Sequence, residues 1–245
     1  MQPIDEADLT PHLIRSRADA VLLRLRAVAA EAGRDPGGFR LVAVTKGFGI
    51  GVVRSAAEAG LTTIGENRVQ EAADKVAAFP ALDWHLIGRL QSNKARQALR
   101  LFSTIHSVDS IELLQRLDRI AAEEGIRRSI LLQVNVAAEE SKAGFDAGWF
   151  AAEAARPGAL ARALGSLRGV EVVGLMTMAP LGATTAAQRD VFAKLRRLRD
   201  ALRLLTGAPL PELSMGMTAD AEAAVAEGSS LVRIGTAIFG PRPTG

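Results

Sequence analysis

The chain contains no cysteine, no tyrosine and only three histidines, and five lysines stand against 25 arginines. Without cysteine, disulfides, thiolate catalysis and thiolate-ligated metals are excluded. The histidines His12, His85 and His106 include no His-x-x-x-His pair, which argues against a transition-metal site. Because arginine supplies positive charge nearly everywhere, each lysine invites a chemical explanation.

Strong net charge, abundant aromatics and long apolar runs are also missing. The formal net charge is 30 − 27 = +3, so the pI of 9.8 reflects a small arginine surplus rather than a basic surface. Phe and Trp together number ten, too few and too apolar in context for a nucleic-acid stacking surface. No run approaches the roughly 18 apolar residues of a membrane span, and the start "MQPIDEADLT" is acidic. We therefore expect a soluble, cytoplasmic protein with no nucleic-acid or membrane partner.

The hydrophobic fraction of 48% over 245 residues is enough for one large core, and no linker or low-complexity segment interrupts it. We expect a single domain over residues 1–245. Eight short apolar runs recur along the chain: "LVAVT" from 41, "TTIG" from 62, "WHLIG" from 84, "TIHSV" from 104, "ILLQVN" from 130, "EVVGLM" from 171, "ELSMG" from 212 and "LVRIG" from 231. Segments with helical periodicity lie between them: 51–60, 67–79, 93–100, 109–124, 146–165, 185–205 and 219–227. Eight apolar strands alternating with helices predict an α/β fold, a (β/α)₈ TIM barrel.

An extra helix is predicted before the first strand. Thr10 can cap it and Pro11 suits its first turn, while Gly33 followed by Pro36 would end it. Its apolar stripe is Ile14, Ala18, Val21, Leu25 and Val28. We expect it across the base or side of the barrel. The "RPGA" at 156–159 predicts that the connection after the fifth strand is divided into two helices.

Polar residues cluster where the predicted strands end, and these ends converge on one mouth in such a barrel. They are Lys46, Glu66, Asn67, Gln91, Ser92, Asn93, Ser107, Asp109, Asn135, Ser214, Arg233, Gly235 and Thr236. The simpler explanation for Ser92, Ser107 and Asp109 is helix capping, which is also one interpretation of Thr218.

Lys46 follows the first strand, in "LVAVTKGF". A neutral lysine amine can form a Schiff base with an aldehyde, which arginine cannot do, but an ordinary ion pair at the mouth is equally consistent with this position. The last two strands end in small residues, Ser214 to Gly216 and Gly235–Thr236, which suit a phosphate site. A phosphate site facing a lysine fits pyridoxal 5′-phosphate, and it fits a phosphosugar aldolase equally well.

Longer motifs resemble one family throughout. "AVTKGF", "IGENRVQEAADK", "WHLIGRLQSNKAR", "IHSVDS", "LLQVNVAAEESKAGF", "VVGLMTMAP" and "LSMGMTADAEAAVAEGSSLVRIGTAIFGPR" follow in the order found in the pyridoxal phosphate homeostasis proteins, whose barrel is similar to the N-terminal domain of alanine racemase. The resemblance implies a barrel of the alanine racemase N-terminal type with pyridoxal 5′-phosphate (PLP) as cofactor, bound as a Schiff base to Lys46.

The same resemblance implies roles for the other candidate site residues. Ser214, Gly216, Gly235 and Thr236 would hold the phosphate, with Thr218 as a further candidate, and Arg233 would approach the pyridine nitrogen. Asn67, His85 and Met176 would line the pocket, although strand alternation leaves open whether the ring of His85 faces the barrel or the helices. Many relatives have tyrosine after "GEN" where this chain has Arg68, so an aromatic contact from that position is not expected.

The resemblance favours a binding protein without a catalytic residue. An arginine at the pyridine nitrogen should leave that atom unprotonated and weaken carbanion stabilisation. The racemase's tyrosine base has no counterpart, and only "AIFGPRPTG" follows Thr236, which leaves no room for the racemase's second domain. We therefore expect a monomeric PLP carrier in PLP homeostasis, with apo PLP-dependent enzymes as possible recipients. The alternative is a PLP-dependent racemase or related enzyme using Lys46 as its sole base.

Overall fold

Eight parallel strands close into a barrel in the computed structural model, which describes residues 5–139 and 142–241. The strands of the ring are β1 (Arg40–Val44), β2 (Thr63–Glu66), β3 (Asp83–Leu86), β4 (Thr104–Val108), β5 (Arg128–Asn135), β7 (Val170–Met176), β8 (Glu212–Ser214) and β9 (Leu231–Ile234), and a ninth strand, β6 (Phe145–Asp146), lies outside it. Pairing runs in the order β4-β3-β2-β1-β9-β8-β7-β5, and the ring closes where β4 pairs with β5. The short β6 pairs with β5 outside this ring and was not predicted. The eight predicted strands and the barrel are confirmed.

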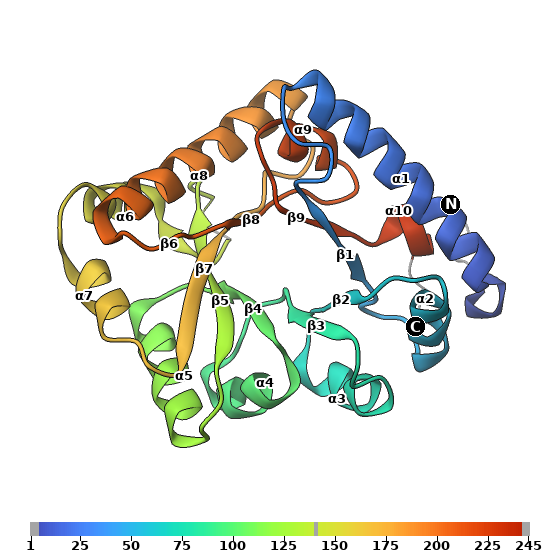
Figure 1. The fold of residues 1–245 in the computed structure, drawn as a ribbon, viewed down its shortest axis with the longest axis horizontal. Helices are drawn as coiled ribbons and strands as arrows, with labels where there is room; N and C mark the ends of the chain where they lie inside the picture. The colour runs from blue at the N-terminus through green and yellow to red at the C-terminus, as the bar shows by residue number, and fades with distance from the viewer. Residues whose placement is uncertain (1–4, 140–141, 242–245) are drawn as a thin grey trace.

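Helices cover the outside of the ring (Figure 1). They are α1 (Pro11–Glu31), α2 (Ile50–Glu58), α3 (Val69–Ala78), α4 (Ala95–Leu101), α5 (Ile111–Glu123), α6 (Ala147–Ala155), α7 (Ala159–Gly165), α8 (Thr185–Thr206), α9 (Ala221–Ala226) and α10 (Thr236–Phe239), with 3₁₀ turns η1 (Glu6–Asp8) and η2 (Ser92–Lys94). The break between α6 and α7 falls at "RPG", as predicted. In the described part of the chain, no helix is both long and apolar enough to cross a membrane.

The N-terminal helix α1 lies along the side of the barrel, against α2, α9 and α10 (Figure 1). Its cap is the Thr10 hydroxyl, which accepts a hydrogen bond from the Leu13 backbone N–H at 3.3 Å, and Pro11 occupies the first turn. The buried stripe ends in Ala29 rather than the predicted Val28, which is only half-buried. Burial of this stripe, more than helix propensity, holds the helix in place.

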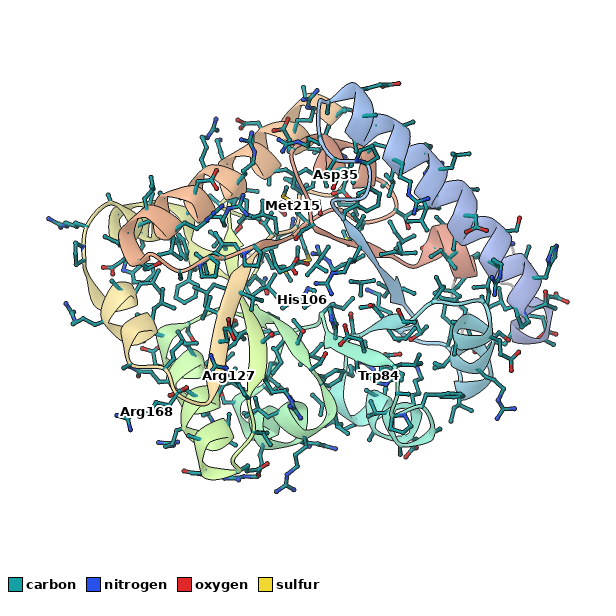
Figure 2. All side chains as sticks on the ribbon, in the orientation of Figure 1. Asp35, Trp84, His106, Arg127, Arg168 and Met215 are labelled. Atoms are coloured by element: carbon teal, nitrogen blue, oxygen red, sulfur yellow. The ribbon has the colours of Figure 1, made fainter. Side chains whose placement is uncertain are left out.

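Two apolar regions stabilise the fold. The larger fills the space between the strands and the helices, and Trp84 belongs to it. The smaller lies inside the ring and has only four buried members, Val42, Leu131, Met176 and Leu231. Polar side chains occupy much of the remaining interior, and Figure 2 shows His106 within the ring of strands. A barrel interior of this kind is packed with side chains, but an unusual share of them here is polar.

The capping predictions for the βα loops are wrong in detail. Ser110 caps α5 by accepting from the Leu113 N–H at 3.2 Å, whereas the Ser107 hydroxyl donates to the Gly88 carbonyl at 2.6 Å. Asp109 instead lies 3.9 Å from the guanidinium of Arg89. Ser92 opens η2 without a side-chain cap bond, and the N-cap of α9 is Asp220 rather than Thr218. The helices α4, α5 and α9 each start two residues later than predicted, because the chain makes a further turn after leaving the strand.

Candidate functional site

Lys46 lies in the turn that follows β1, half-buried at the carboxyl end of the barrel. The turn is completed by Gly47, whose φ of +77° is a conformation that glycine adopts without a side-chain clash. The neighbouring strand β9 is in register with β1, with Ala43 opposite Ile234. The end of β9 therefore reaches the mouth beside Lys46.

A buried ion pair lies on the helix side of this turn. Lys75 from α3 contacts Glu66 at the end of β2 with an Nζ–Oε1 distance of 2.7 Å, and it also donates to the Thr45 carbonyl at 3.1 Å. The Thr45 hydroxyl donates to the same Glu66 oxygen at 2.6 Å. The other carboxylate oxygen of Glu66 is buried without a hydrogen-bond partner among the described residues. This pair anchors the chain immediately before Lys46.

Sequence reasoning did not single out Lys75. The signal was present, because Val69, Ala72 and Lys75 form the buried face of α3, and a lysine on such a face requires a buried counter-ion. Lys142, a second lysine near the mouth, contacts Glu139 at 2.7 Å and donates to the Ala179 carbonyl at 3.0 Å. Both amines are thus held by a carboxylate and a backbone carbonyl.

Four of the predicted phosphate residues, Gly216, Thr218, Gly235 and Thr236, form one wall of the mouth, from the loops after β8 and β9. Ser214 instead is buried at the end of β8, with its hydroxyl bonded to Arg233 and His106. Two hydrogen bonds hold the loop after β8 against β9 and the residues that follow it. The Arg233 N–H of β9 donates to the Gly216 carbonyl at 3.1 Å, and the Ala237 N–H donates to the Thr218 hydroxyl at 3.4 Å. Gly216 has a φ of +89°, and a Cβ there would lie 2.5 Å from the Cβ of Ala224. A Cβ on Gly235 would lie 3.3 Å from the Val44 carbonyl oxygen. Thr236, the next residue, is exposed.

Arg233 points into the barrel from β9 and is almost fully buried. Its guanidinium donates from one terminal nitrogen to the Ser214 hydroxyl and from the other to the Thr177 carbonyl at 3.0 Å. Among the residues that the structure describes, no carboxylate is within ion-pair distance of it. Burial lowers the pKa of Arg233 to about 10, opposed by the more distant charge of Asp220, so the group is still cationic at neutral pH.

The ring of His85 faces the barrel interior, which resolves the alternative that the sequence left open. Its Nδ1 lies 2.9 Å from Nε2 of His106, and its Nε2 lies 3.0 Å from the Asp83 carboxylate. His106 in turn lies 2.8 Å from the Ser214 hydroxyl through its Nδ1. Burial is the main cause that holds the pKa of His106 well below its usual value, so this ring is neutral at neutral pH.

The remaining two predicted pocket residues lie apart from each other. Met176 is buried in the small apolar cluster inside the ring. Asn67 follows β2 and borders a cavity of about 270 Å³ between the loops after β2 and β3, together with Arg68, Arg89 and Lys94. Lys46 does not line this cavity. Asn67 thus follows β2, which is separated from β9 in the ring by β1 alone.

A closed parallel (β/α)₈ barrel with its polar groups gathered at the carboxyl ends of the strands is a ligand-binding barrel by fold and site. The chain belongs to the family described as "Alanine racemase, N-terminal domain", whose model matches residues 17–243, and within it to the pyridoxal phosphate homeostasis proteins. This confirms the family that the motifs predicted.

The relatives match over nearly their whole length. The pyridoxal phosphate homeostasis protein of Pseudomonas aeruginosa is 43% identical over 227 residues, which cover 92% of this chain and 94% of the relative. PipY of Synechococcus elongatus, solved with PLP bound, is 41% identical with a TM-score of 0.77 over 93% of this chain and 100% of its own. Alanine racemase of Clostridium difficile shares the fold at 14% identity, with a TM-score of 0.66 over 91% of this chain and 57% of that one.

Proposed function

We propose that this chain binds PLP at the barrel mouth, attached reversibly to Lys46, and serves in intracellular PLP homeostasis. The curated relatives in Pseudomonas aeruginosa and Synechocystis bear the name pyridoxal phosphate homeostasis protein, and PipY has been solved with PLP bound. When bound, PLP supplies an aldehyde that condenses reversibly with a primary amine. The observation that carries the proposal is the position of Lys46 beside the glycine-bearing end of β9.

The residues at the mouth fit the three functional groups of PLP. Lys46 offers the amine for the aldehyde. The loops after β8 and β9 pack closely against α9 and β1 where Gly216 and Gly235 have no side chain, and Thr218 and Thr236 belong to the same two loops, so the backbone N–H groups and hydroxyls of this wall would take the phosphate. Arg233 would face the pyridine nitrogen from inside the barrel, as a cation that donates but does not accept a hydrogen bond.

The three other predicted pocket residues would act less directly. Met176 would form the apolar floor of the pocket, and His85 lies deeper in the barrel, behind His106. Asn67 would border the mouth at the end of β2. We propose none of them as a covalent partner of PLP.

Covalent attachment is tested by borohydride reduction of the loaded protein, followed by digestion and peptide mass mapping. We expect the pyridoxyl adduct on the peptide that contains Lys46, and we expect Lys46→Ala and Lys46→Arg to lose both the adduct and the visible absorption of bound PLP. Lys94→Ala and Lys142→Ala are the matched controls and should keep both. An adduct that persists in Lys46→Arg would refute the assignment of Lys46.

We further propose that the chain is a carrier and not an enzyme. The relatives are named as homeostasis proteins, and a cationic Arg233 disfavours protonation of the pyridine nitrogen, which weakens the ring as an electron sink. The absence of tyrosine from the sequence removes the second base that a racemase of this architecture would use. The proposal predicts transfer of PLP to an apo PLP-dependent enzyme when the two proteins are mixed.

Two measurements separate a carrier from an enzyme. A carrier should reactivate an added apo-enzyme at a rate that depends on the carrier concentration, and it should leave the α-hydrogen of amino acids unexchanged in D₂O. Deuterium incorporation into any member of an amino-acid panel, lost in Lys46→Ala, would favour the alternative of a PLP-dependent racemase or related enzyme.

We propose that the protein is a cytoplasmic monomer. Its exposed large apolar side chains, Leu23, Ile50, Trp149, Leu181, Leu204 and Met217, come from six separate elements or loops rather than one patch. Scattered residues of this kind are normal on monomer surfaces. Sedimentation of the loaded and unloaded protein at 25.8 kDa across a range of concentrations would support the monomer, and a concentration-dependent rise in mass would contradict it.

A further inference from the structure

Five polar side chains from four strands form a continuous hydrogen-bonded line through the barrel. It runs from Arg233 on β9 to Ser214 on β8, to His106 on β4, and then to His85 and Asp83 on β3. The three links that involve a histidine measure 2.8, 2.9 and 3.0 Å. Arg233, Ser214 and both histidines are buried, and the line ends at a carboxylate that is partly exposed at the start of β3. We call this line the interior hydrogen-bond chain.

The chemistry of its two ends gives the interior hydrogen-bond chain a direction. A guanidinium can only donate hydrogen bonds, and an ionised carboxylate can only accept them. The bond from His85 is the main cause that lowers the pKa of Asp83 to about 2, so this carboxylate is ionised at neutral pH. Donation therefore starts at Arg233 and ends at Asp83.

The links between the ends follow from counting hydrogens. The Ser214 hydroxyl accepts from Arg233, and its single hydrogen has the bare Nδ1 of His106 as acceptor. The neutral His106 then carries its proton on Nε2 and donates to Nδ1 of His85, which donates from Nε2 to Asp83. In this arrangement every polar hydrogen between the ends has an acceptor. A doubly protonated His85 would reverse the histidine links and place a second cation in the barrel with Arg233.

We propose that Asp83, His85 and His106 are positioning residues for Arg233. We also propose that Ser214 acts through the interior hydrogen-bond chain rather than on the phosphate. The inference rests on the proposed PLP function and extends it. Because the only hydroxyl hydrogen of Ser214 is given to His106, it cannot also be donated to a phosphate oxygen. The interior hydrogen-bond chain aligns its dipoles with the charge of Arg233. This alignment offsets the lack, among the described residues, of a carboxylate beside the guanidinium. It thus holds the guanidinium cationic and correctly oriented for the pyridine nitrogen.

The first test determines which ring nitrogens of His85 and His106 carry protons in the protein without PLP. The measurement is ¹⁵N NMR of histidine-labelled protein at neutral pH. We expect His85 and His106 to carry one proton each, both on Nε2, with Nδ1 bare. His12, exposed on α1, is the internal reference. A doubly protonated His85, or a proton on Nδ1 of His106, would overturn the proposed direction. This outcome does not depend on whether PLP binds, so it separates the inference from the proposed function.

The second test removes the carboxylate where substitution is tolerated, at the partly exposed Asp83. Asp83→Ala should change the ¹⁵N signals of the Nε2–H groups of His85 and His106. It should also weaken PLP binding by about three- to tenfold, which corresponds to the net contribution of one hydrogen bond. Ser103→Ala is the matched control, because it removes the hydrogen bond from the Ser103 hydroxyl to Asp83 and leaves the interior hydrogen-bond chain intact. Asp83→Asn, whose amide oxygen still accepts from His85, should restore the signals.

The PLP affinities and the histidine signals of the two variants together give two further outcomes. Equal PLP affinity and unchanged histidine signals in Asp83→Ala and Ser103→Ala would overturn the positioning role. Loss of PLP binding in both variants with normal histidine signals would mean that Asp83 acts on the mouth by another route, which also contradicts the proposal.

Discussion

At the scale of single residues, the lysines of this chain differ by what surrounds their amines. Lys75 is buried between Glu66 and the Thr45 carbonyl, so its charge is part of the fold. Lys46 comes directly after Thr45, at the carboxyl end of the barrel. The buried pair therefore fixes the backbone from which Lys46 extends, the residue that we propose as the attachment point of PLP.

Removing the counter-ion should reveal how much this anchor contributes. Glu66→Gln leaves a buried lysine without a carboxylate and should lower the free energy of unfolding by about 3 to 5 kcal/mol. Glu71→Gln, which breaks the exposed pair with Arg68, is the control and should change it by less than about 1 kcal/mol. Urea unfolding followed by circular dichroism measures both. Equal effects would mean that the Glu66–Lys75 pair does not anchor the turn.

At the scale of elements, the phosphate wall depends on two short loops that few residue types could form. The loop after β8 reverses at Gly216 and packs against α9, and the loop after β9 begins with Gly235 against the end of β1. Thr218 links the two loops through its bond with the Ala237 N–H, a role that its predicted place as a helix cap did not suggest. The short elements α9 and α10 thus define the wall more through loop packing than through their own length.

Gly216→Ala should therefore disturb both the loop and the binding site. The substitution adds the strain of a positive φ to a contact of 2.5 Å with Ala224, and we expect a loss of about 1 to 3 kcal/mol in stability together with weaker PLP binding. Gly207→Ala is the matched control, since Gly207 has a φ of +70° but no atom within 4 Å of the added Cβ. It should cost about 1 kcal/mol. If both variants lost the same stability and kept full PLP affinity, close packing at Gly216 would not matter.

At the scale of the whole molecule, the barrel interior carries titratable groups where most such barrels carry aliphatic side chains. His106 is neutral because burial disfavours its charged form, and Asp83 is ionised because His85 donates to it. In both groups the folded-state pKa is lower than the unfolded one, so the unfolded chain binds more protons in acid. The folded state should therefore lose stability as the pH falls, first through His106 and then through Asp83.

The pH range over which the folded state loses stability is set by His106 and Asp83. Below the ordinary histidine pKa of 6.5, His106 takes up a proton only in the unfolded chain, which implies a slope approaching about 1.4 kcal/mol per pH unit. The contribution of Asp83 is present above its ordinary pKa of 3.8 and is lost as the pH falls toward about 2. Denaturant unfolding of wild type and His106→Gln at pH 7, 6 and 5 tests the first step. An identical slope in the variant would contradict it.

Much of this protein was predictable from the residues alone. Eight apolar runs with helical segments between them predicted the barrel, and "RPGA" predicted the break between α6 and α7. The motifs predicted the family, which the comparisons confirm, and the matching relatives carry the name pyridoxal phosphate homeostasis protein. The roles of the individual site residues stay predictions, because no bound PLP tests them. These successes rest on local patterns, which depend on the order of residues and not on their contacts.

Contacts between distant strands were beyond the reach of the sequence. The alternation in β3 places Asp83 and His85 on one face but does not say which face lies inside, and nothing local relates His106 to Ser214 or Ser214 to Arg233. Those contacts depend on the stagger with which the strands close the ring. The sequence by itself determined the elements, the position of Lys46 after the first strand and the small residues of the mouth. The tertiary structure alone decided which buried polar groups meet, because hydrogen bonds need partners within about 3 Å and only the closed barrel brings them that near.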